Sequence, residues 1–148
     1  MDQQIPSTET LKAGSIKKQD GKEFIYAYSA AGVTAKTMVK LSYSSSLNPR
    51  VAAQSDSATQ ARWVIPNETV AATSWGWFHT RGLVEDAVAG STITVTAGHA
   101  LKHHNRIITS MTAAFAGNNY EFGVCPTGAA GKTTLDIYLY GRESLGTT

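Results

Sequence analysis

The sequence has little of what would crosslink the chain, anchor it in a membrane or attract a charged partner. Its single cysteine, Cys125, excludes an internal disulfide and a metal site built from several thiolates. There is no run of eighteen apolar residues that could form a membrane-spanning helix. Charged residues make up 16% of the chain and the formal net charge is +2, a balance too weak to favour nucleic acid or an anionic membrane. We therefore expect neither as a partner.

What the sequence has in quantity is small and β-branched residues. Among 148 residues there are 20 alanines, 18 threonines and 13 glycines, while leucine is sparse. Threonine favours strands, and small side chains let sheets or neighbouring chains pack closely, whereas a helical bundle needs more long apolar residues. The length is that of one domain with one sizeable core. The composition therefore predicts a single domain rich in β-sheet.

The first part of the chain differs from the rest. Residues 1–22 are polar and show no period of 2 or 3.6, which predicts an extended N-terminal arm preceding a β-rich body over residues 23–148. The only sizeable apolar side chains of this arm, and hence its candidate contact residues, are Ile5, Pro6, Leu11 and Ile16.

The body consists of short strand-like segments separated by turn signals, without an alternation of strands and helices. This pattern predicts an all-β fold, a sandwich or a barrel. Glycines 76 and 82 within one long segment predict bulges in a curved sheet. Residues 67–73 are compatible with one helical turn capped by Asn67. The expected strands cover residues 23–30, 36–43, 60–66, 74–90, 91–98, 118–125 and 133–140, and residues 106–117 fit a strand or a short helix.

Gly131, Lys132 and Thr133 look like the end of a phosphate-binding loop. The Walker A pattern needs a glycine five positions before Gly131, but this chain has Pro126, which lacks the N–H that would hold a phosphate. The loop must also begin a helix. Here apolar residues alternate with polar ones over residues 133–140, which predicts a strand after a hairpin loop. No nucleotide cofactor is expected.

The remaining reactive side chains form no convincing active site. His99, His103 and His104 are close in sequence, but no acidic residue lies near them to complete a zinc site, and an intersubunit or surface cluster is the better interpretation. The adjacent acids at positions 85 and 86 fit a polar turn between strands. Cys125 fits a buried structural thiol. We expect no catalytic residue, no metal and no enzyme activity.

The densest aromatic group is formed by Trp75, Trp77 and Phe78. In a strand, Trp75 and Trp77 share one face while Phe78 points to the other. One face can pack in the core, and the alternative is an anchor in a subunit contact, where aromatic residues are enriched. All three are candidate contact residues. Base stacking would need a basic groove, and only Arg81 is close in sequence.

Two stretches resemble known proteins. "WGWFHTRGLVEDAVAGSTITVTAGHALK", residues 75–102, resembles a segment that recurs in small virion proteins of tailed bacteriophages: Gly-Trp, an apolar strand, a glycine, a second strand and a Thr-Ala-Gly turn. "FIYAYSAAGVTAKTMVKLS", residues 24–42, is similar to the early part of phage head decoration (cement) proteins, with an aromatic strand, an Ala-Gly turn and a second strand.

The resemblance implies a β-rich virion protein without an active site, assembled in the host cytoplasm. Such a protein docks on the outside of the phage head, binds the major capsid protein, commonly forms trimers and stabilises the shell. The N-terminal arm suits strand addition to a neighbour. Two alternatives stay open: a tail, head–tail connector or minor coat component, and a small β-barrel module that binds a carbohydrate or another ligand through Trp75 and Trp77.

Overall fold

A computed structural model describes residues 13–44, 48–52, 62–104, 107–110 and 121–141. All regular secondary structure in these residues is β-strand, which confirms the predicted all-β class. No helix of this part of the chain is long and apolar enough to cross a membrane. The strands are β1 (Ile16–Gln19), β2 (Lys22–Ser29), β3 (Val39–Tyr43), β4 (Pro49–Ala52), β5 (Arg62–Pro66), β6 (Ser74–Val95), β7 (His99–His104), β8 (Ile107–Ser110), β9 (Glu121–Cys125) and β10 (Ala129–Tyr140).

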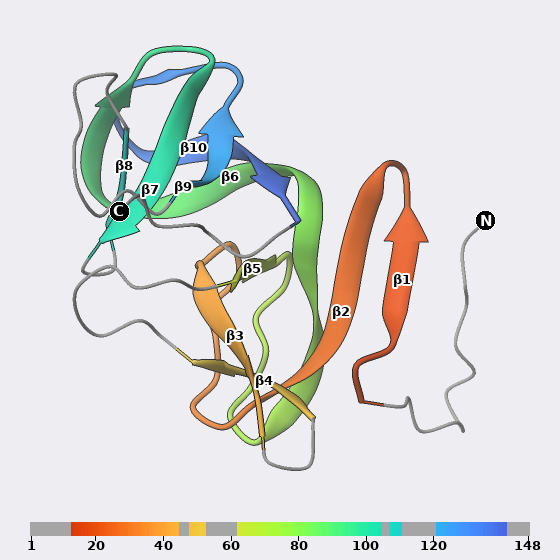
Figure 1. The fold of residues 1–148 in the computed structure, drawn as a ribbon. Coiled ribbons are helices and arrows are strands. Elements are labelled where there is room, and N and C mark those ends of the chain that lie inside the picture. The colour runs from red at the N-terminus through yellow and green to blue at the C-terminus, as the bar shows by residue number, and fades with distance from the viewer. Residues whose placement is uncertain (1–12, 45–47, 53–61, 105–106, 111–120, 142–148) are drawn as a thin grey trace, which may run out of the picture.

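The first half of the chain closes into a barrel. Its strands follow the order β2-β4-β3-β5-β6, and a further pairing between β2 and β6 closes the ring. Strands β2 and β4 run parallel, while the other neighbours in the ring are antiparallel. Strand β1 pairs with β2 outside the ring and forms one edge of the sheet (Figure 1). Of the two predicted architectures, the structure is therefore the barrel.

The second half continues the same sheet in the order β6-β10-β9-β7-β8. These strands curl round so that β8 also lies against β6, above the first barrel in Figure 1. The expected strand over residues 133–140 is part of β10. Its alternation places Leu135, Ile137 and Leu139 in the core, as the period of two predicts. The preceding hairpin loop is shorter than expected, because β10 already begins at Ala129.

Strand β6 runs through both halves. The sequence predicts two strands here, over residues 74–90 and 91–98, with a turn at Glu85 and Asp86, but β6 is continuous over 22 residues. Instead of a turn there is a bulge. Between the pairs Ile137–Val84 and Leu135–Ala87, β6 has one residue more than β10. Asp86 takes a φ of 55°, and its N–H donates to Asp136 Oδ1 at 3.1 Å.

Two groups of buried apolar side chains fill the two halves. The group inside the first barrel includes Ile25, Leu41, Val64 and Phe78, all at most 5% exposed. The other gathers side chains of β6 to β10, and it also takes in Trp63, Ile65 and Met38 from the first half. The two halves are therefore packed against each other through apolar side chains, in addition to sharing β6.

Two local expectations are corrected by the structure. Residues 16–19, expected within the arm, form β1 and pair with β2. The expected helical turn at residues 67–73 is absent, because Val70 forms a β-bridge with Val33 in both directions, at 2.8 Å each. These bonds engage the backbone groups that a helical turn would need. Residues 1–12 and most of 106–117 lie outside the described residues.

Candidate functional site

The outward faces of β2 and β6 bring four aromatic side chains together. On β2 the inward residues, among them Ile25 and Ala27, are buried, so the residues between them point out of the barrel. In the antiparallel pairing of β2 with β6, Tyr28 lies opposite Trp75 and Tyr26 lies opposite Trp77. We refer to Tyr26, Tyr28, Trp75 and Trp77 as the aromatic strip.

The rings of the aromatic strip are in mutual contact. Tyr26 and Trp75 are stacked, with ring centroids 5.5 Å apart and planes 16° apart. Tyr26 also meets Trp77 at 5.2 Å, and Tyr28 meets Trp75 at 5.5 Å, both with tilted planes. Such pairs stabilise each other by about 1 kcal/mol beyond the burial of their area. The strip is thus held in place by its own contacts, although 39% of the surface of Trp75 remains exposed.

A cation covers the strip near each end. At one end Lys17 of β1 places its Nζ 4.7 Å from the Trp77 ring centroid and 4.9 Å from that of Phe24. At the other end the Arg50 guanidinium of β4 lies 5.5 Å from the Tyr28 ring centroid. All three distances fall within the range of cation–π attraction.

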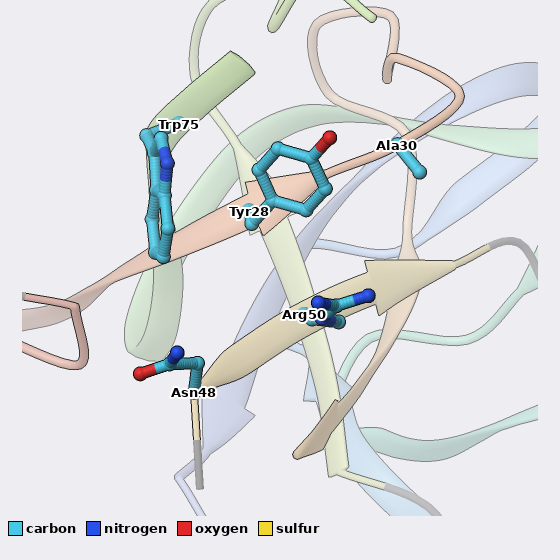
Figure 2. A pocket seen from close by; sticks show the side chains of 5 residues that line it. All are labelled: Tyr28, Ala30, Asn48, Arg50 and Trp75. Atoms are coloured by element: carbon cyan, nitrogen blue, oxygen red, sulfur yellow. The ribbon is translucent and has the colours of Figure 1, made fainter. Parts of the chain in front are cut away.

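The Arg50 end of the strip is hollowed. A depression of about 300 Å³ is lined by side chains from three strands and the residues beside them (Figure 2). Trp75 and Tyr28 form two walls, and Arg50 and Asn48 lie below them. The lining residues are Tyr28, Ala30, Asn48, Arg50 and Trp75.

The structure places the candidate contact residues of the sequence analysis in different environments. Trp75 and Trp77 share the outer face, as expected, whereas Phe78 is fully buried inside the first barrel and is not available for a contact. Ile16 is 46% exposed on the edge strand β1. The other three, Ile5, Pro6 and Leu11, lie outside the described residues. Tyr26 and Tyr28 are not recognisable from the sequence as partners of the tryptophans, because strand pairing cannot be predicted from the spacing of residues.

His79 is a buried group that the sequence does not reveal. It lies on β6 opposite Phe24 of β2 and Ile65 of β5, and its ring is 4.2 Å from the Phe24 ring. Within the described part of the chain, neither ring nitrogen has a hydrogen-bond partner. Burial, followed by repulsion from Lys22 and other lysines nearby, lowers the pKa of His79 to about 4.

The remaining reactive side chains include one cysteine and the charged groups around Glu23. Cys125 is fully buried, as the sequence predicts. No three His, Cys, Asp or Glu side chains among the described residues come close enough to hold a metal ion. Glu23 contacts Lys18 at 4.0 Å and Arg62 at 3.8 Å and accepts a hydrogen bond from Thr80 at 3.0 Å, which are structural contacts.

The likeness of this chain to known proteins concerns its fold. No protein-family model matches the chain, and no curated protein sequence does. Among solved structures, the chain is similar to the N base of the head fiber gp8.5 of bacteriophage phi29, with a TM-score of 0.55 and 12% sequence identity. The likeness covers 82% of this chain and 96% of that chain. At this identity it shows that the two share a fold.

Proposed function

We propose that this chain is a structural protein of a bacteriophage head: a decoration protein that binds the outer surface of the shell and stabilises it. The observation that carries the proposal is the shared fold with a phage head fiber base, whose chain is matched over 96% of its length. The resemblance of residues 24–42 and 75–102 to phage virion proteins supports the same assignment from the sequence. The proposed partners are the major capsid protein and further copies of this chain, as a homotrimer.

The proposed contacts with the shell lie on the N-terminal arm and the adjoining edge of the sheet. Among the described strands β1 is at the edge of the sheet, and none of them pairs with the side of β1 that faces away from β2, which suits pairing with a strand of a neighbour. Ile16 adds an exposed apolar side chain to that edge. Trp77 is a further proposed contact residue, whereas Trp75 lines the hollow and is considered below. Many copies on a repeating lattice would make weak individual contacts sufficient.

The test is deletion of residues 2–12. The deletion stops there because Gly14 N–H donates to Tyr26 O, and Tyr26 N–H donates to Ser15 O, each at 2.9 Å. Removing these residues as well would disturb β2 itself. We expect the shortened chain to keep the circular dichroism and thermal unfolding of the parent and to lose co-sedimentation with empty phage heads.

A matched control replaces residues 2–12 by a Gly/Ser sequence of equal length. It distinguishes the effect of the side chains of the arm from the effect of the length of the arm. Undiminished sedimentation of both variants with heads would refute the role of the arm. Copy number in the particle separates the proposal from its rival: hundreds of copies fit a shell protein, and six or twelve fit a neck or tail component. Light scattering of the purified protein measures whether it is a trimer.

A further inference from the structure

The hollow at the Arg50 end of the aromatic strip has the features of a ligand site. Its three main side chains lie in one row across adjacent strands: Trp75 of β6 is opposite Tyr28 of β2, and Tyr28 is opposite Arg50 of β4. Side chains that are neighbours across paired strands point to the same face, about 5 Å apart. The row is therefore set by backbone hydrogen bonds and does not depend on a loop closing over the ligand.

The backbone of the residues around the row is also held by hydrogen bonds. Thr73 N–H donates to Ala30 O at 3.1 Å, which holds the end of β2 beside the start of β6. Asn48 N–H donates to Ser44 Oγ at 3.2 Å, and Asn48 O accepts from Ser44 N–H at 2.9 Å. Arg50 is steadied by its position over the Tyr28 ring. The backbone of the site is thus held in place before a ligand binds.

The chemistry of the lining points to a ring that is apolar on its face and polar at its rim. Trp75 and Tyr28 offer two apolar walls, while the guanidinium and the amide below them offer hydrogen bonds. A volume of about 300 Å³ is at the small end of ligand sites and suits one or two sugar rings. A pyranose has the matching character, with C–H groups on its faces and hydroxyl groups around its rim.

The charge of the lining further restricts the class of ligand. Arg50 is the one charged residue among those that line the hollow, and the ion pairs of the described residues do not include it. A guanidinium matches a carboxylate in a bidentate geometry. Single-stranded nucleic acid would need a track of cations along its backbone, whereas Arg50 is the one cation that lines the hollow and Lys17 lies at the far end of the strip.

We propose that this hollow binds a uronic or other carboxylated sugar residue of an acidic glycan, with Trp75 and Tyr28 against the ring and Arg50 on the carboxylate. Asn48 donates to or accepts from the ring hydroxyls. This assignment does not depend on attachment to a phage head, and it assigns Trp75 to ligand binding in preference to contact with the shell.

The test uses the isolated full-length protein on an array of uronic-acid, sialic-acid and neutral oligosaccharides, with a thymidine homopolymer as a further spot. The strongest glycan is then titrated by calorimetry beside its carboxyl methyl ester, which keeps the ring and removes the charge. We expect binding to acidic glycans, and binding of the ester about ten-fold or more weaker, since a hydrogen bond to a charged group is lost.

Three variants locate the site. Trp75→Ala should abolish glycan binding, and Arg50→Gln should bind the acid and its ester equally. Tyr138→Ala is the matched control, because Tyr138 is also 39% exposed but lies on β10. It should bind like the parent, and thermal unfolding should show that all three variants are folded. Binding to neutral glycans or to thymidine alone, no binding to any acidic glycan, or unchanged binding by folded Trp75→Ala would each overturn the proposal.

Discussion

His79 should make the stability of this protein fall as the solution is acidified, well before the carboxylates are protonated. Its ring is fully buried at the place where β6 pairs with β2 on one side and β5 on the other. Burial and the positive charges of Lys22, Lys36 and Lys17 oppose protonation and lower its pKa to about 4. An unfolded chain has no such constraint, and its histidine titrates near 6.5.

The sign and the size follow from these two values. Between pH 6.5 and pH 4 the unfolded chain binds a proton at this position and the folded chain does not, so acid favours unfolding. Above pH 6.5 His79 causes no loss of stability. Below that pH the free energy of unfolding falls by about 1.4 kcal/mol for each unit by which the pH is lowered, and the loss is about 3 kcal/mol at pH 4. At pH 5 the expected loss is about 2 kcal/mol. A small domain has a total stability of about 5–15 kcal/mol, so this is measurable.

The assay is urea unfolding at pH 7 and pH 5 for the parent and for His79→Leu. Leucine has a similar volume, cannot be protonated, and replaces ring nitrogens that have no hydrogen-bond partner among the described residues. We expect the variant to lie within about 1.5 kcal/mol of the parent at pH 7 and to lose about 2 kcal/mol less between pH 7 and pH 5. His99→Leu, at an exposed position of β7, is the matched histidine-to-leucine control. Equal pH dependence in the parent and His79→Leu would refute the reasoning.

Two further predictions concern packing. Phe78→Ala should lower the free energy of unfolding by about 3–5 kcal/mol, because Phe78 fills the first barrel, whereas Trp77→Ala on the outer face should cost about 1 kcal/mol. Similar losses in urea unfolding would contradict this division between the two faces of β6. Gly123→Ala should destabilise the second half by about 1–3 kcal/mol, because the added Cβ would lie 2.5 Å from Tyr138 O. An unchanged unfolding midpoint would show that β9 and β10 can separate at little cost.

The all-β class of the fold could be predicted from the sequence, because the alternation of apolar and polar residues within a strand is a local pattern. The alternation over residues 133–140 correctly gives the buried face of β10. The opposite orientations of Trp77 and Phe78 follow from their adjacency in a strand. Which of the two faces is the core is not a local property, since it depends on the pairing of β6 with β2 and β5. For the same reason, the position of Tyr26 and Tyr28 beside the tryptophans could not be predicted from the sequence.

The errors arise where the pairing of strands decides the local structure, and in two of the three cases the pairing is long-range. The acids at positions 85 and 86 resemble a turn, but the hydrogen bond from Asp86 N–H to Asp136 keeps them in β6 as a bulge. The polar residues 16–19 show no strand period, yet they pair with the start of β2, whereas β4 pairs with its end at Tyr28 and Ser29. Asn67 looks like a helix cap, but Val70 is drawn into a bridge with Val33. In the first and third cases the partner lies more than thirty residues away along the chain, whereas β1 and β2 form a hairpin around Asp20 and Gly21.

The 22-residue length of β6 has a consequence for how the molecule comes apart. The first part of this strand closes the first barrel, and the rest of it pairs with β10 in the second half. Neither half can therefore unfold without removing pairing partners from β6. The protein should therefore melt in a single cooperative step. It should also fold slowly, because β6 pairs with segments that are distant from it on both sides in the sequence, and such long-range contacts form slowly.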